Sequence, residues 1–128
     1  MPQVGDELSE TYMASAMHYW SIRGHNADIY VHEPPPEYCD TDFIMPGFIK
    51  MKKAKFMELD PETLASTTRQ VANLQIIGAE ITWRKSALKL ELVYIHELGH
   101  AFGYGHVDIR NHIMQPIYDY MGKAFFIP

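Results

Sequence analysis

One eleven-residue segment has the residue types and the spacing of a metal site. It reads His96-Glu97-Leu98-Gly99-His100-Ala101-Phe102-Gly103-Tyr104-Gly105-His106. On a helix, residues four apart lie one turn apart on the same face, with Cβ atoms roughly 5–6 Å apart. His96 and His100 can therefore both place an imidazole nitrogen about 2.0–2.1 Å from one zinc ion.

Glu97 and Gly103 add two features to this histidine pair: a group that can exchange protons and a turn that can bring in a third ligand. Glu97 lies about 100° around the helix from His96, so its carboxylate is a poor ligand but can exchange protons with a water on the metal's open side. Gly103 can adopt the left-handed conformation that ends a helix, which lets the chain turn back and bring in His106 as a third ligand. Three histidines and one open position are typical of a catalytic zinc site.

Chance is a poor explanation of this pattern. In a chain of 128 residues with 7 histidines, His-Glu-x-x-His has an expectation of about 0.03, and the further Gly and His lower it to about one in ten thousand. We therefore interpret the segment as a metal centre rather than as histidines that merely lie on a helix.

The segment resembles the signature of the metzincin metallopeptidases, His-Glu-x-x-His-x-x-Gly-x-x-His followed by a methionine turn. Residues 113–118, Ile-Met-Gln-Pro-Ile-Tyr, are similar to the methionine turn and the Pro-x-Tyr segment of the matrixin branch. The resemblance implies that Met114 lies beneath the zinc as a hydrophobic base. It also implies that Pro116 and Tyr118 form the wall of the pocket for the substrate side chain after the scissile bond.

The resemblance is specific over residues 88–118 and weaker upstream, where residues 16–21 and 27–29 resemble the first helix and the following strand of a matrixin. The chain also departs from that family. Cys39 does not stand in the family's Pro-Arg-Cys-Gly-type propeptide motif, and the His/Asp cluster of the family's structural zinc and calcium sites is not recognisable. Because few residues follow Met114, we expect the helix that closes the lower half of the domain to be missing or reduced.

The secondary structure of the first half of the chain is predicted from the spacing of its apolar residues and from the positions of glycine and proline. An amphipathic helix is predicted over residues 8–23, with Gly24 as its stop, and a strand over residues 27–32. Residues 43–59 are expected to be extended, with a turn at Pro46-Gly47. The lysines in this stretch suit an edge strand or a hairpin.

The second half is predicted to contain two more helices around a strand. Asp60-Pro61-Glu62 has the form of a helix start, which predicts a helix from Pro61 to about Gln75. Residues 76–83 favour a strand, with a continued helix as the alternative, and we expect this strand to be the edge along which an extended peptide adds. Ser86 is expected to cap the helix that carries the histidines.

These elements predict an α+β fold of the metzincin type. We expect a small mixed sheet packed on the active-site helix and on one or two further helices. The length of the chain suits a single catalytic domain over residues 1–128.

Composition narrows the class of protein. The formal net charge is −5, and the absence of a Lys/Arg cluster argues against a nucleic-acid partner. No apolar run approaches the ~20 residues of a membrane span, so we expect no membrane partner. No signal peptide is readable at the N-terminus, which predicts a cytoplasmic or non-classically exported protein. The single cysteine suits a reducing compartment.

The sequence allows more than one role for other polar residues and for the C-terminal segment. Asp108 either orients a ligand or caps a turn. The remaining histidines are expected to be surface residues or to have satisfied hydrogen bonds: His18, His25, His32 and His112. Residues 124–128, Ala-Phe-Phe-Ile-Pro, are too apolar for water, so they either pack back on the core or dock on another copy or an assembly partner.

The sequence favours a zinc-dependent endopeptidase that acts on a peptide or protein substrate, with Zn²⁺ as cofactor. In this hypothesis a water activated by Glu97 attacks a peptide carbonyl polarised by the metal, and the protonated carboxyl then assists departure of the amine. One alternative is a zinc-containing structural or assembly module with little or no peptidase activity, such as a component of a virion or a secretion machine. A second is an endoribonuclease of rRNA maturation, an enzyme type that shares a His-x3-His-x5-His array but lacks the glutamate and the methionine turn.

Overall fold

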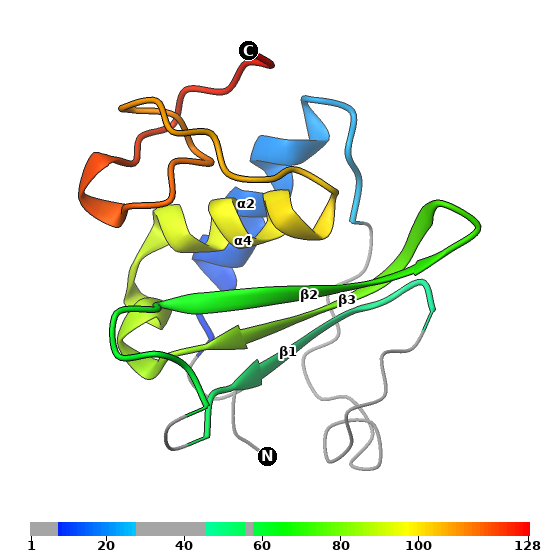
Figure 1. Cartoon of the computed structure of the whole chain (residues 1–128), viewed down its shortest axis with the longest axis horizontal. Helices are drawn as coiled ribbons and strands as arrows, with labels where there is room; N and C mark the ends of the chain where they lie inside the picture. The colour runs from blue at the N-terminus through cyan, green and yellow to red at the C-terminus, as the bar shows by residue number, and fades with distance from the viewer. Residues whose placement is uncertain (1–7, 28–45, 56–57) are drawn as a thin grey trace.

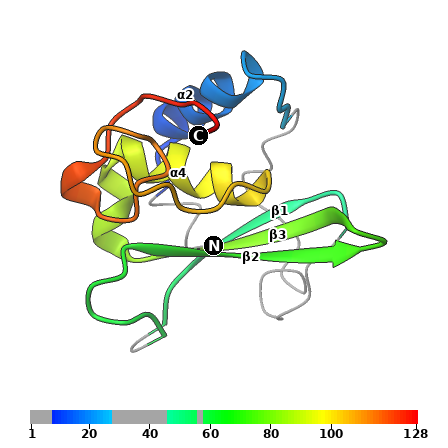
Figure 2. The same cartoon turned by 45° about the horizontal axis from the view of Figure 1, so that its top comes forward.

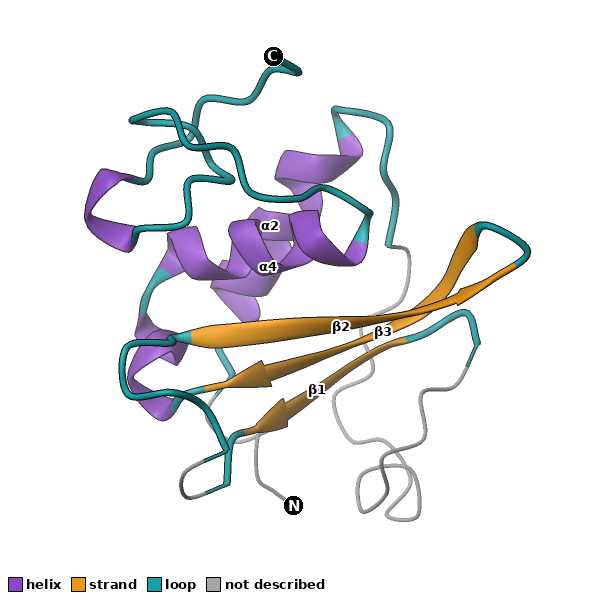
Figure 3. Ribbon diagram, in the orientation of Figure 1, coloured by secondary structure: helices purple, strands orange, loops and turns teal. Residues whose placement is uncertain are grey.

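The computed structural model describes residues 8–27, 46–55 and 58–128 of the chain. Within these ranges the elements, in chain order, are α2 (Glu10–Ser21), β1 (Ile49–Lys53), β2 (Ala65–Ala72), β3 (Gln75–Trp83), η1 (Lys85–Lys89), α4 (Glu91–Ala101) and η2 (Tyr118–Tyr120). The strands form one sheet, and both α-helices lie on the same side of it (Figures 1 and 3). The predicted α+β class is confirmed.

The sheet is small and mixed, as predicted. Its strand order is β1-β3-β2. β1 runs parallel to β3, with Ile49 opposite Ala79, and β2 runs antiparallel to β3, with Thr67 opposite Ile81. Helix α4 packs on β2 and β3, and α2 packs on α4. Figure 2 shows the same order of layers, with the C-terminal segment beyond α4 on the side away from the sheet.

Helix α2 confirms the helix predicted over residues 8–23, apart from a few residues at its ends. Ser9 caps it by accepting a hydrogen bond from the backbone N–H of Tyr12, which supplies one of the partners that a helix start lacks. Trp20 is fully buried, and its indole N–H donates to the carbonyl of Ile95 at 2.7 Å. This bond ties α2 directly to the helix that carries the histidines. The chain leaves α2 through Gly24, at φ +94°.

The helix predicted from Pro61 to Gln75 is wrong, because residues 65–72 form strand β2. Asp60 and Thr63 make a turn instead of a helix start, with the Thr63 N–H donating to the Asp60 carbonyl at 2.9 Å. Asn73 and Leu74 both have positive φ, 52° and 65°, the twist that joins two antiparallel strands through a two-residue loop. Pairing with β3 therefore outweighs the local helix signal.

The expectation that residues 76–83 form an edge strand is also wrong. They do form a strand, β3, but it lies in the centre of the described sheet, with β1 on one side and β2 on the other. Its backbone groups are paired along both edges. In the described part of the chain, β2 and β1 have a neighbour on one side each.

The histidine-bearing helix begins later than predicted. Ser86 falls inside the short helix η1, and α4 starts at Glu91 after Leu90, which is extended at φ −116° and ψ 102°. The break places Ala87 and Leu88 in the core. The Tyr94 hydroxyl holds the segment between η1 and α4 in place: it donates to the Leu88 carbonyl at 2.9 Å and accepts from the Ser9 N–H.

The remaining fold predictions have mixed outcomes. The turn at Pro46-Gly47 is confirmed, and β1 follows it at an edge of the described sheet. Residues 28–32 of the strand predicted over residues 27–32, and Cys39, lie outside the described residues. No helix in the described part of the chain is long and apolar enough to cross a membrane.

Candidate metal centre

Three histidine side chains converge at the C-terminal half of α4. His96, His100 and His106 each offer a ring nitrogen, and the three nitrogens lie within 4.8 Å of one another. The Nε2 atoms of His96 and His100 are 3.1 Å apart. Two nitrogens bound at about 2.0–2.1 Å to one tetrahedral ion lie about 3.3 Å apart, so this spacing fits a shared zinc ligand sphere.

Hydrogen bonds to backbone carbonyls set the tautomers of the two helical histidines. Nδ1 of His96 lies 2.7 Å from the Ile113 carbonyl, and Nδ1 of His100 lies 2.8 Å from the Tyr104 carbonyl. A carbonyl oxygen only accepts, so each Nδ1 carries the proton and each Nε2 has a free lone pair. The donor set therefore fits zinc, held by these two Nε2 atoms and a ring nitrogen of His106.

His106 reaches the site because α4 ends sharply. Gly103 has φ +112° and its N–H donates to the His100 carbonyl, which confirms the predicted left-handed helix end. The returning loop is pinned where the Val107 N–H donates to the Met114 carbonyl at 2.9 Å. His106 itself is exposed, with its ring centroid 4.8 Å from that of His100.

Desolvation favours the neutral form of these imidazoles, most strongly at the buried His96. Loss of water around His96 lowers its pKa to about 4, and the same desolvation lowers the pKa values of His100 and His106. A metal ligand must be unprotonated. The lowered pKa values therefore favour the unprotonated form that a metal ligand needs.

Glu97 follows His96 in α4, is buried, and is held by a residue of β2. Its side chain is 5% exposed, and the Thr67 hydroxyl lies 2.6 Å from Oε1 and donates to it. Desolvation raises the pKa of Glu97 to about 7, against the lowering effect of the Thr67 bond. A carboxyl that titrates near neutrality can both take up and release a proton there.

Met114 packs against α4 between the two turns that carry His96 and His100. It is fully buried, and a Cβ built on Gly99 would lie 2.6 Å from its Sδ and 2.7 Å from Cζ2 of Trp20. Only a residue without a Cβ fits that contact. Met114 thus packs directly on the histidine helix, and its role as a hydrophobic base beneath a zinc ion stays a prediction.

Two polar side chains hold the turn that contains Met114. Nδ1 of the buried His112 accepts from the Met114 N–H at 3.0 Å, so its Nε2 carries the proton and donates to the Phe126 carbonyl at 2.9 Å. Asp108 accepts from the Gln115 amide at 3.3 Å rather than from a histidine. Asp108 therefore supports this turn and does not orient a ligand.

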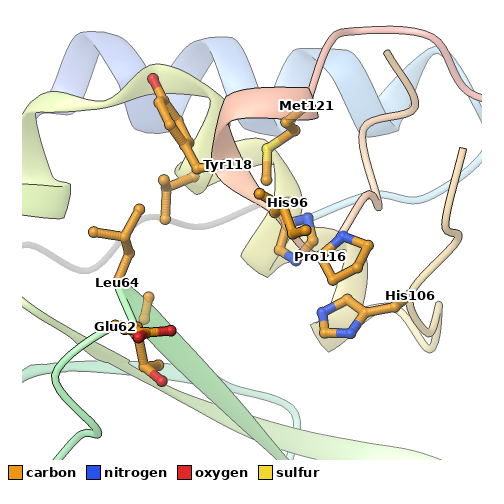
Figure 4. A pocket seen from close by; sticks show the side chains of 11 residues that line it. Glu62, Leu64, His96, His106, Pro116, Tyr118 and Met121 are labelled. Atoms are coloured by element: carbon orange, nitrogen blue, oxygen red, sulfur yellow. The ribbon is translucent and has the colours of Figure 1, made fainter. Parts of the chain in front are cut away.

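A cavity of about 320 Å³ opens beside the histidines. Pro116 and Tyr118 lie in its lining with His96 and His106, and so do Leu64 and Glu62 from the segment before β2. Figure 4 shows that the lining comes from these separate stretches of chain. Pro116 and Tyr118 thus line a cavity together with two of the three histidines, and their role as the wall of a substrate pocket stays a prediction.

Sequence reasoning missed Thr67 and Glu62. Both lie in the stretch that was predicted to be helical, and that error hid their approach to α4. The alternation of Thr67 with exposed neighbours along β2 is the signal that a strand assignment would have used.

The comparison with protein families agrees with this geometry. The sequence model of the matrixin family matches residues 6–127, so the match extends well upstream of the histidine motif. No curated protein and no solved structure matches the chain.

Proposed function

Since the chain belongs to the matrixin family, we propose that it is a zinc-dependent endopeptidase whose general base is Glu97. The observation that carries the proposal is the convergence of three imidazoles with lowered pKa values on a helix that also carries a buried carboxyl group. The imidazole nitrogens lie within 4.8 Å of one another, and the pKa of the adjacent Glu97 is about 7. A site that only binds zinc for structure has no use for such a carboxyl.

Bound zinc would polarise the substrate carbonyl and lower the pKa of water. Glu97 takes one proton from the attacking water, whose oxygen forms the new bond to the carbonyl carbon. When the C–N bond breaks, Glu97 returns that proton to the amine, so the carboxyl group ends as it began. Thr67 keeps Oε1 in one place during both transfers, through the bond at 2.6 Å.

The substrate backbone is expected to add along β2. This strand borders the described sheet on one side, and its Thr67 touches Glu97. An extended peptide can pair with such an edge through main-chain hydrogen bonds. The side chain after the scissile bond then faces the cavity that Pro116 and Tyr118 line.

Replacement of Glu97 by glutamine tests the proposal. Glu97→Gln keeps the shape but removes the proton acceptor, and loss of a general base typically slows a reaction by ~10²–10⁴. Zinc content should be unchanged, because Glu97 is not among the ligands. Peptide hydrolysis is measured for both proteins at matched zinc occupancy.

Glu91→Gln is the matched control. Glu91 stands on the same helix but bonds to Ser15 and Lys123, outside the site, so this variant should hydrolyse peptides at the original rate. Equal rates for the original chain and Glu97→Gln would eliminate the mechanism. Absence of hydrolysis by the zinc-loaded original chain would instead favour the assembly module.

A further inference from the structure

We propose that the cavity beside the metal centre selects a cationic side chain, lysine or arginine, directly after the scissile bond, and that Glu62 makes the selection. The inference rests on the proposed function, because that function places the side chain after the scissile bond in the cavity. It goes beyond that function by naming the substrate chemistry and a residue that determines specificity.

Part of the cavity lining is apolar and can cover the stem of a long side chain. Val93 and Leu64 contribute aliphatic surface from α4 and from the segment before β2, and Met121 and Ile117 contribute it from the C-terminal segment. Lysine and arginine bury their methylene stems against such surface while the charged head stays near water.

One carboxylate stands in this lining, and no lysine or arginine does. Glu62 is exposed to solvent and forms no ion pair within the described part of the chain. In Figure 4 it lies beside Leu64, apart from His106 and Pro116. A cationic head at Glu62 therefore also stays away from the positive charge of a metal at the histidines.

The segment that carries Glu62 is fixed by Arg84. The Arg84 Nε donates to the Thr63 carbonyl at 2.8 Å and its Nη2 donates to the Asp60 carbonyl at 2.6 Å. The guanidinium thus holds the backbone on both sides of Glu62 without pairing with its carboxylate. Because the backbone is already held, only the Glu62 side chain has to be ordered when its carboxylate meets a cation.

The strength of the selection follows from exposure. Because solvent screens an exposed ion pair, the expected preference is about threefold to tenfold rather than several hundredfold. It should weaken as salt rises from about 0.05 to 0.5 M, where screening shortens to a few ångströms.

The test compares two peptides that differ only after the cleaved bond, one with lysine and one with norleucine. Norleucine has the same four-carbon stem without the charge. Binding is measured by fluorescence anisotropy to the zinc-loaded Glu97→Gln protein, which leaves the peptides intact, and cleavage is measured with the original chain. We expect the lysine peptide to bind about threefold to tenfold more tightly.

Variants of Glu62 in the same Glu97→Gln background show whether Glu62 causes the preference for the lysine peptide. Glu62→Gln should bring the ratio of the two affinities to about one, and Glu62→Lys should make the norleucine peptide the tighter ligand. Asp119→Asn removes one negative charge from an exposed residue outside the cavity lining, so it should keep the original ratio.

Three outcomes overturn the inference: equal binding of the two peptides, failure of both to bind, or a preference that survives Glu62→Gln. Failure of the proposed function looks different. In that case the lysine peptide binds more tightly through Glu62, but the zinc-loaded original chain cleaves neither peptide.

Discussion

At the scale of single residues, the chemistry depends on how burial moves proton equilibria in opposite directions. The same loss of water that lowers the pKa of His96 to about 4 raises that of Glu97 to about 7. The histidines are thereby kept as bases and the carboxyl is kept as a group that can carry a proton. Burial thus favours the unprotonated form of the histidine and the protonated form of the carboxyl group on the same helix.

These shifts predict how acid affects the metal-free protein. The pKa values of the histidines are lower in the folded state, so their contribution to stability is lost as pH falls below about 6.5. The pKa of Glu97 is higher in the folded state, so its contribution grows as pH falls from about 7 towards 4.5. The two effects oppose each other between pH 7 and 5.5.

Removing the Glu97 titration should therefore make the histidine effect visible. Glu97→Gln is expected to lose more free energy of unfolding than the original chain when pH is lowered from about 7 to 5.5. Urea unfolding of both metal-free proteins at the two pH values measures the difference. An equal loss in both would show that Glu97 does not titrate in this range.

At the scale of elements, the position of the histidine helix depends on the absence of one side chain. Gly99 to alanine would normally favour a helix by about 0.5–1 kcal/mol. Here the new Cβ would lie 2.6 Å from Met114 Sδ and 2.7 Å from Trp20, and both neighbours are fully buried. The crowding outweighs the helix preference.

We expect Gly99→Ala to destabilise the protein by about 1–3 kcal/mol, the usual cost of overpacking a core. Zinc affinity should fall as well, because Met114 follows Ile113, whose carbonyl orients His96. Gly105→Ala is the control: a Cβ at that position meets nothing within 4 Å and should cost little. Thermal unfolding and metal titration of both variants check this, and a neutral Gly99→Ala would argue against the close contact.

The elements also show why the sequence predicts some of the site and not the rest. His96 and His100 belong to one helix, so their spacing alone places them together, and Gly103 adds His106 within the same segment. Thr67 and Glu62 reach the site through strand pairing between distant residues. The turn that joins β2 to β3, Asn73-Leu74, contains no glycine, so the sequence has no strong hairpin signal there. The Asp-Pro-Glu start signal favoured a helix, and only the pairing with β3 makes this stretch a strand.

At the scale of the whole molecule, the C-terminal segment is linked by contacts and hydrogen bonds to the turn that contains Met114. The ring of Phe125 packs edge-on against Trp20 and Tyr104, with centroids 5.0 Å away in each case. The next carbonyl, of Phe126, accepts from His112, which in turn accepts from Met114. The segment thus packs on the core, and its docking on another copy stays a prediction.

This chain of contacts predicts that the tail supports metal binding at a distance. Phe125→Ala should lower the free energy of unfolding by about 2–3 kcal/mol, less than for a fully buried phenylalanine because the ring is partly exposed. It should also weaken zinc binding, since His112 and the Met114 turn lose their cover. Ile127→Ala removes a side chain that is 69% exposed and should change neither quantity. Urea unfolding and metal titration of the two variants measure these changes, and sedimentation follows association of the chain. If Phe125→Ala keeps both stability and zinc affinity, the C-terminal segment does not support the metal centre. If Ile127→Ala instead dissociates an oligomer, the exposed end of the tail is an interface between copies.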